Sequence, residues 1–413
     1  MNSTLRRHAD AIVKEAVAAV LPDEAVRRAL AQHPLTGNVY LVAAGKAAWQ
    51  MAQTASDCLG TLSGGVVVTK YGHVMGDIPG CVCYEAGHPV PDEHSFLATR
   101  AALDLVQSAK EGDTVLFLLS GGGSALFEQP LVPGKELADI TQQLLACGAD
   151  IVEMNTVRKR LSAVKGGRFA QACAPAKVFS VVLSDILGDP LDMIASGPAC
   201  PDTTTCEQAL EVVKKYGLQL SERAMECLRT ETPKQLDNVE TQITGSVSEL
   251  CAAAAASCRR LGYKSVVLTD RLCCEAREAG SFLASVAKSH ADTTEPLAFL
   301  AGGETVVHLT GKGKGGRNQE LALAAAPGLA GMKNAAVFSV GSDGTDGPTD
   351  AAGGYADGDT CAVLTRCGLT VHQVLSANNA YPTLKAAGGL IVTGPTGTNV
   401  NDIAVALITP NKT

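Results

Sequence analysis

Four short apolar runs of the chain each end in residues that could bind or transfer a charged group. These residues are a lysine, a triple glycine between serines, an aspartate, and a loop rich in glycine and aspartate: Lys46, 120–124, Asp185 and 341–347. At the carboxyl ends of buried strands, such residues would line the crevice where α/β proteins bind ligands. A cation, inward-facing backbone amides and carboxylates are together the parts of a phosphoryl-transfer site. The sequence therefore favours an enzyme.

The triple glycine is the most direct signal for an anion. It comprises Ser120, Gly121, Gly122, Gly123 and Ser124. Three consecutive glycines allow backbone N–H groups to face inward around a phosphate, and the dipole of a following helix would add to the attraction. A plain tight turn is the alternative, but it rarely requires three glycines in a row. The P-loop motif Gly-x-x-x-x-Gly-Lys-Ser/Thr is absent, which excludes a P-loop kinase.

Five cations lie between positions 158 and 168. Of these, Arg158, Lys165 and Arg168 could clamp phosphates or the carboxylate of a substrate. A charge run usually means a solvated helix face, which is the alternative. Two consecutive glycines, 166–167, interrupt the helix where a ligand could approach. We predict that Lys165 binds phosphate.

Three aspartates are candidates for proton transfer or metal binding. Asp185 follows an apolar run and is a candidate general base or magnesium ligand, with helix capping as the alternative. Asp343 and Asp346 share one glycine-rich loop, for which a pair of acidic turns is the alternative. We expect Asp185 to be the base, and Asp343 and Asp346 to bind Mg²⁺.

The segment Gly311–Gly316 matches the dinucleotide fingerprint Gly-x-Gly-x-x-Gly between an expected strand and an expected helix. Alone this signal is weak, and a flexible turn explains it equally well. Its two lysines and the following Arg317 suit a mobile basic loop that closes over phosphates.

Alternating strand-like and helical runs indicate how these residues are positioned. With 413 residues the chain predicts two domains, at 1–235 and 236–413, divided in a polar segment. The first domain is expected to be Rossmann-like, a mostly parallel sheet with helices on both faces. Its strands are expected at 39–44, 65–69, 114–119 and 178–183. Its helices are expected at 7–32, as one helix or a pair, and at 46–58, 93–109, 135–151 and 202–216. The second α/β domain is expected to have strands at 264–269, 297–301, 304–310 and 336–340, and helices at 246–261, 274–290 and 317–326.

Composition excludes several classes of protein. The net charge of −8 argues against a nucleic-acid partner. There is neither an apolar run long enough to span a membrane nor an N-terminal signal core. Fourteen scattered cysteines without Cys-x-x-Cys, and eight histidines without ligand spacing, indicate reduced buried thiols rather than zinc or disulfides. We expect a cytoplasmic protein.

An ordered set of motifs along nearly the whole chain resembles the class II glycerate kinases, whose C-terminal part is called the MOFRL domain. The matching stretches are 43–47, 69–73, 85–92, 119–125, 155–160, 183–185, 196–198, 302–304, 316–320, 341–347 and 393–402.

The resemblance implies ATP-dependent phosphorylation of D-glycerate to 2-phosphoglycerate, with Mg²⁺ and with the active site in a cleft between the domains. It implies that Lys46 and Arg317 are essential, that Asp185 is the base, and that Glu304 and Asn318 help to bind ATP. Some members of this family carry the label hydroxypyruvate reductase, so an NAD(P)H-dependent reductase is the alternative. The residues leave the oligomeric state open, a homodimer included.

Overall fold

The computed structural model describes residues 1–411, which form two units. One unit comprises Ala25–Thr244, and the other combines Met1–Glu24 with Gly245–Thr413. The division expected at residue 235 differs from this one in two respects. Strand β6 (Val239–Gly245) forms an edge of the first sheet, and helix α1 (Ser3–Ala19) packs on helix α11 (Val247–Arg260) of the second unit. The polar segment 222–242 is not a linker, since it comprises a helix at 222–228, an irregular stretch and the start of the edge strand β6.

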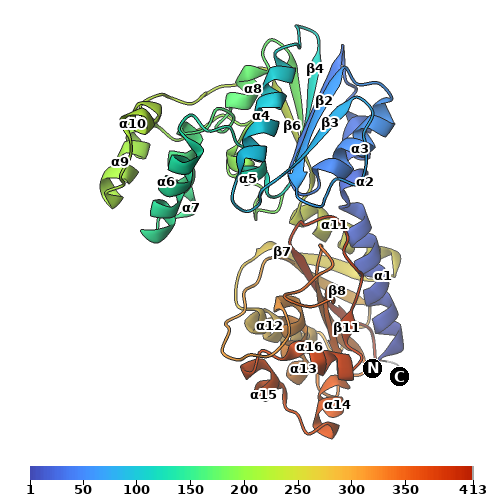
Figure 1. Ribbon diagram of the computed structural model, residues 1–413. Coiled ribbons are helices and arrows are strands. Elements are labelled where there is room, and N and C mark those ends of the chain that lie inside the picture. Colours follow the sequence, from blue (N-terminus) through green and yellow to red (C-terminus); the bar gives the residue numbers. More distant parts are fainter. Residues whose placement is uncertain (412–413) are drawn as a thin grey trace. The chain divides into compact units, whose positions relative to one another are not determined.

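The unit Ala25–Thr244 contains a six-stranded sheet in the order β3-β2-β1-β4-β5-β6 (Figure 1). Its other strands are β1 (Val39–Ala44), β2 (Gly64–Lys70), β3 (Cys81–Ala86), β4 (Thr114–Leu119) and β5 (Lys177–Leu183). Neighbours from β3 to β5 pair in parallel, as the sequence predicted. The strand order reverses between β1 and β4, and doubly wound sheets bind their ligands at the carboxyl ends beside such a reversal.

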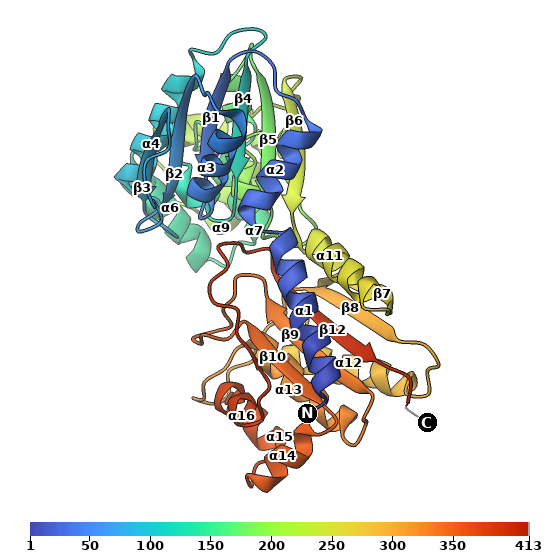
Figure 2. The ribbon, with the colours of Figure 1, turned by 90° about the vertical axis from the view of Figure 1, so that its right-hand side faces the viewer.

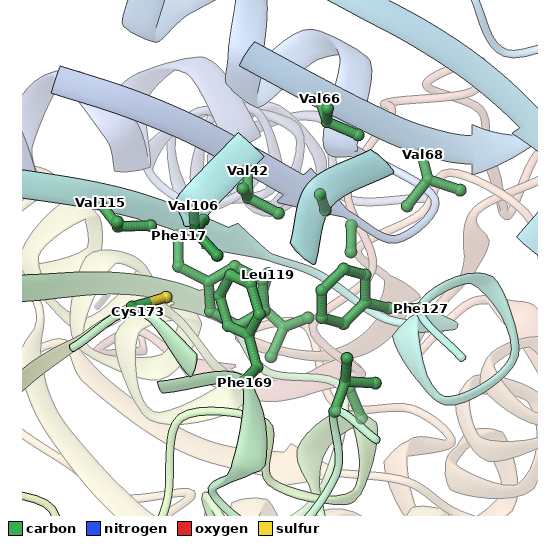
Figure 3. Close-up of a cluster of buried hydrophobic side chains, with 14 of the residues drawn as sticks. Val42, Val66, Val68, Val106, Val115, Phe117, Leu119, Phe127, Phe169 and Cys173 are labelled. Carbon is green, nitrogen blue, oxygen red and sulfur yellow. The ribbon is translucent and has the colours of Figure 1, made fainter. Parts of the chain in front are cut away.

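Both faces of this sheet are buried. Leu41 and Ala43 pack with residues of α2 (Pro22–Gln32) and α3 (Ala48–Leu59). Val42, from the opposite face of the same strand, packs with residues of α4 (Glu93–Val106) and α8 (Arg168–Ala172). In Figure 3 the rings of Phe117, Phe127 and Phe169 meet in this second cluster, with centroids 4.7–5.5 Å apart.

Four further helices of this unit form a lobe with its own core (Figure 1). They are α6 (Gly134–Ala146), α7 (Ile151–Arg160), α9 (Cys206–Tyr216) and α10 (Glu222–Leu228). The helix expected at 135–151 ends at Ala146, and the next helix begins at Ile151. The chain turns at Gly148, whose φ is +73°, and Asp150 then caps α7 by accepting a hydrogen bond from the Glu153 N–H.

The second unit contains a six-stranded sheet in the order β11-β10-β9-β12-β8-β7 (Figure 2). Its strands are β7 (Lys264–Leu272), β8 (Leu297–Gly303), β9 (Ala335–Gly341), β10 (Gly353–Asp357), β11 (Leu390–Ile391) and β12 (Asp402–Ile408). Only β7 and β8 pair in parallel among the pairs of this sheet in residues 1–411. Helices α12 (Ala276–Ser289) and α13 (Arg317–Leu329) cover one face, and α1 and α11 pack on the other. Three short helices complete the unit: α14 (Thr360–Arg366), α15 (Val371–Ser376) and α16 (Ala380–Ala386).

The strand expected at 304–310 was wrong. This segment is a loop with one isolated bridge, between Val306 and Glu275. Of its three aliphatic residues, Val306 and Leu309 are exposed, and only Val307 packs against a core. None of the helices formed by residues 1–411 has the length and apolar character that crossing a membrane requires.

Candidate active site

Lys46 lies where β1 and β4 end side by side. It follows β1 through Gly45, whose Cα is so close to Ser120 that a Cβ atom would lie 2.2 Å from Ser120 Oγ. The Lys46 N–H donates to the carbonyl oxygen of Gly121 at 2.9 Å, and the Ala47 N–H donates to Ser120 Oγ at 3.1 Å. These bonds fix Lys46 next to the triple glycine.

The residues Gly121–Gly123, called the glycine nest below, are glycines because other side chains approach their Cα atoms. A Cβ atom at Gly121 would lie 2.2 Å from Asp185 Oδ2. One at Gly122 would lie 3.3 Å from Lys46 Cγ and 3.0 Å from His88 Cδ2. The structure therefore brings Lys46, the nest and Asp185 together at the carboxyl edge of the sheet. The helix after the nest, α5 (Gly123–Leu126), is a single turn, so it adds less to anion binding than the sequence suggested.

His88 was not predicted as a site residue. It follows β3, and its ring is partly buried against Gly122. Burial lowers the pKa of His88, and the charges of Lys46 and Lys70 lower it further. The imidazole is therefore neutral at physiological pH and can either donate or accept a hydrogen bond beside the nest. The one feature of the sequence that could have indicated His88 as a site residue is its position within the family motif 85–92.

Lys165 has a different environment from the one predicted. Its side chain is fully buried, and its ammonium group donates to Ser124 O at 2.9 Å, to Phe127 O at 3.3 Å and to Glu128 Oε2 at 2.6 Å. Burial lowers the pKa of Lys165 despite the opposing effect of Glu128. Because all three ammonium protons have acceptors within the protein, Lys165 stabilises the loop after the nest.

Breaking this pair should unfold the protein rather than impair catalysis directly. Lys165→Met leaves the buried Glu128 carboxylate without its cation, which we expect to cost about 3–5 kcal/mol of unfolding free energy. Lys165→Met combined with Glu128→Gln removes both charges and should recover most of the stability and the activity together. Urea unfolding and activity assays of both variants test this. A stable but inactive double variant would instead favour the predicted phosphate contact.

The neighbouring cations are not a solvated helix face, which was the alternative interpretation. Lys159 and Arg160 are buried beside Asp202, with N···O distances of 3.2 and 3.6 Å. Arg168 donates from Nη1 to the carbonyl oxygens of Arg160 and Ser162, at 3.2 and 2.7 Å. These three cations join α7 to the segments that follow it.

In the second unit, Arg317 begins α13 and is fixed by two carboxylates. Its Nε and Nη2 donate to the two oxygens of Asp402 at 2.5 and 3.0 Å, and its Nη1 lies 2.9 Å from Glu304 Oε1. Burial lowers the pKa of Arg317, but Asp402 and Glu304 outweigh it and produce a net rise. A third of the Arg317 side chain remains exposed, so the oriented guanidinium can still contact a ligand.

Asp346 caps the same helix. Its two carboxylate oxygens accept the N–H groups of Asn318 at 3.1 Å and Gln319 at 2.9 Å. Burial raises the pKa of Asp346 to about 6, against the effect of these hydrogen bonds. Asn318 is also buried, and its Oδ1 accepts from Ser339 Oγ at 2.5 Å. Asp346 was predicted to bind a metal ion and Asn318 to bind ATP. Both side chains already form hydrogen bonds within the protein.

Asp343 is more open. It is partly exposed, and its Oδ1 accepts the Thr345 N–H at 2.9 Å. A Cβ atom at Gly341 would lie 3.2 Å from this oxygen and 3.3 Å from Asp402 Oδ1, so the two carboxylates flank the same glycine. Among residues 1–411, no group of three or more His, Cys, Asp or Glu side chains could by itself hold a metal ion.

The segment Gly311–Gly316 does not have the context of a dinucleotide fingerprint. No strand directly precedes it, and Gly311, Gly313 and Gly315 pack against residues 377–381, whereas Gly316 packs against Asp346. The side chain of Asn378 accepts the N–H groups of Thr310 and Gly311 at 2.8 and 2.7 Å. The glycines are thus explained by close packing within the unit, which removes the feature that had supported a reductase.

Two family matches and one relative identify the chain. Residues 8–229 match a family described as a domain of unknown function, DUF4147, and residues 297–402 match the MOFRL family. The chain is 52% identical to a D-glycerate 2-kinase of Thermotoga maritima, over 98% of this chain and 99% of the relative. The chain belongs to the glycerate 2-kinase family that carries the MOFRL domain.

Other relatives agree with this family assignment. A glycerate 2-kinase of Pyrococcus horikoshii is 41% identical over 97% of each chain. A crystal structure of glycerate kinase from Thermotoga maritima matches 98% of this chain and 99% of that chain, with a TM-score of 0.95 and 52% identity. A protein of Agrobacterium vitis, 41% identical over 98% of this chain, is named only provisionally as a hydroxypyruvate reductase.

Proposed function

We propose that this protein transfers the γ-phosphoryl group of ATP to D-glycerate and releases 2-phosphoglycerate and ADP. The observation that carries the proposal is the meeting of Lys46, the glycine nest and Asp185 at the strand reversal. This arrangement occurs in a chain that matches a D-glycerate 2-kinase along nearly its whole length. Phosphoryl transfer depends mainly on positioning and charge neutralisation, and this site supplies both.

In the proposed mechanism, the backbone amides of the nest and the Lys46 ammonium bind the phosphates of ATP. Asp185 accepts the proton of the reacting glycerate hydroxyl. The hydroxyl oxygen then bonds to the γ-phosphorus as the bond from that phosphorus to the ADP oxygen breaks. Arg317, oriented by Asp402 and Glu304, neutralises the phosphoryl oxygens. The location of the active site in a cleft between the domains stays a prediction.

Mg²⁺ would neutralise the phosphate charges of ATP when bound. Magnesium usually retains waters and takes only one or two protein carboxylates, so a single open aspartate beside the phosphates is enough. Of the two predicted ligands, Asp343 is open enough for such a contact. Asp346 does not, because both its oxygens already accept backbone N–H groups.

We also propose that the protein acts in the cytoplasm with ATP and D-glycerate as its partners. All fourteen cysteines are free thiols, which suits a reducing compartment. The oligomeric state, a homodimer included, stays open.

A pair of assays separates the kinase from the reductase. With ATP, Mg²⁺ and D-glycerate, the protein should release ADP at a rate proportional to enzyme concentration. With NADH or NADPH and hydroxypyruvate it should show no turnover, since the glycine-rich segment is packed within the protein. NAD(P)H oxidation without ADP release under matched conditions would overturn the proposed function.

A further inference from the structure

We infer that Arg158 binds the carboxylate group of the substrate, beside the glycine nest. This inference rests on the proposed function, because it assigns a contact to one end of D-glycerate. Arg158 lies in the last turn of α7, and its side chain is partly buried. The sequence alone offered Arg158, Lys165 and Arg168 equally for this role, and the structure separates them.

The first argument is the distribution of partners among the five cations of 158–168. Three of them, Lys159, Arg160 and Lys165, form ion pairs with buried carboxylates. Arg168 donates to backbone carbonyl oxygens. The guanidinium of Arg158, in contrast, forms no ion pair with any carboxylate of residues 1–411. Its Nε atom, like that of Arg160, is buried without a hydrogen-bond acceptor, but Arg160 has carboxylate partners for its other nitrogens. A buried charged donor without an acceptor is unfavourable and needs an explanation, which an anionic ligand supplies.

The second argument is the position of Arg158 on α7. Asn155 lies three residues earlier on the same helix face, and its Oδ1 accepts from Ser196 Oγ at 2.9 Å. Ser196 Oγ in turn lies 3.0 Å from Ser124 Oγ, directly after the nest. Long side chains on a helix generally lean toward its N-terminus, and the turn on that side of Arg158 contains Asn155. A series of hydrogen-bonded polar groups thus runs from Asn155, on the helix face of Arg158, to Ser124 directly after the nest.

The electrostatic field agrees with this position. Burial is the main cause that lowers the pKa of Lys165, and the charge of Arg158 lowers it further. Lys165 donates to Ser124 O at 2.9 Å, so the charge of Arg158 acts at the end of the nest. Glu128 neutralises Lys165 there, which leaves Arg158 to attract an anion.

The loop facing this region has a constrained backbone. Ala195 and Ser196 both have positive φ, at +51° and +62°, although neither is glycine. Ala195 also packs against the nest, since a Cβ atom at Gly123 would lie 2.8 Å from Ala195 Cβ. Such conformations persist where the surrounding structure fixes them, often at binding sites. Here they hold the Ser196 hydroxyl between Asn155 and Ser124.

The chemistry of the substrate matches these groups. D-glycerate carries one carboxylate, which a planar guanidinium can bind through two parallel hydrogen bonds. In the proposed mechanism Lys46 and the nest are engaged by ATP, so the carboxylate requires a cation of its own. Arg158 then becomes the residue that distinguishes glycerate from glycerol, which has hydroxyl groups but no carboxylate.

The test is a comparison of Arg158→Gln with the control Arg229→Gln, an exposed arginine in the same unit. Arg158→Gln should raise the KM for D-glycerate roughly ten- to hundredfold, the usual effect of losing a charge-assisted hydrogen bond. The KM for ATP should stay within about twofold of wild type. The preference for D-glycerate over glycerol is the kcat/KM for glycerate divided by the kcat/KM for glycerol. It should fall by the same factor as the kcat/KM for glycerate, because glycerol has no carboxylate for Arg158 to bind. Arg229→Gln should change none of these values.

The outcomes separate this inference from the function on which it rests. Wild-type protein that releases no ADP with D-glycerate would overturn the proposed function and the inference with it. An active Arg158→Gln variant with an unchanged KM for D-glycerate would overturn only the inference, as would equal rises in the KM values for ATP and glycerate. If Arg158→Gln does not fold, Arg158→Lys is tested in its place. This variant retains the positive charge but loses the planar guanidinium group. It should raise the KM for glycerate alone, and an unchanged KM would again contradict the inference.

Discussion

Asp185→Asn is expected to lower kcat by about 10²- to 10⁴-fold, the usual range for loss of a general base. The substitution retains the shape of a side chain that lies against the Cα atom of Gly121, so the fold should be preserved. The amide cannot accept the proton of the glycerate hydroxyl, and the loss should therefore appear in kcat. Steady-state kinetics with coupled ADP detection measures it, with thermal unfolding as the check on the fold.

Asp189→Asn is the matched control, because it makes the same chemical change in the same loop. Asp189 has a φ of +52°, a conformation that asparagine adopts readily, so this variant should retain near-normal kcat. Titration with Mg²⁺ and Mn²⁺ separates a base from a metal ligand. Activity of Asp185→Asn that recovers at high metal concentration would assign the metal to Asp185, whereas we expect that behaviour from Asp343→Asn.

The strand-end residues could be predicted from the sequence because the signal is local. An apolar run of six or seven residues followed directly by a glycine or a polar residue marks the carboxyl end of a buried strand. Parallel ends lie at one edge of a sheet, so Lys46, the nest and Asp185 had to lie near one another. His88 was missed because the strand that precedes it, β3, lies at the edge of the sheet. Its side chains are partly exposed, so its sequence is not a continuous apolar run that would mark a buried strand.

The partners of buried charges could not be predicted in the same way. Lys165, Asn318 and Asp346 have side chains suited to ligands, and their sequence context gives no sign that they are already engaged. Lys165 is paired with Glu128, 37 positions earlier, and Asp346 caps a helix that begins about 30 positions before it. Which polar groups remain available to a ligand depends on such long-range contacts. Arg158 is the converse case, since the missing acceptor of its buried Nε within residues 1–411 also becomes visible only in the folded chain.

Arg317→Ala is expected to lower kcat at least about a hundredfold, as is Lys46→Ala, because in the proposed mechanism each residue supplies a positive charge to the phosphate groups. Arg317→Lys should recover little, since a point charge does not replace the two hydrogen bonds of the guanidinium fork. Arg317→Ala also leaves the buried Asp402 carboxylate without its bidentate partner, so a loss of stability should accompany the loss of activity.

The double variant Arg317→Ala with Asp402→Asn separates the structural contribution of Arg317 from the catalytic one. Removing both charges should restore the midpoint of thermal unfolding toward that of the wild type, because no buried carboxylate then remains unpaired. Activity should not return, since the cation required by the phosphoryl oxygens is still absent. The Lys165 and Glu128 pair is expected to behave in the opposite way, with stability and activity recovering together. If the Arg317 and Asp402 double variant also regains activity, Arg317 serves only to neutralise Asp402, and the charge at the transferring group must come from another residue.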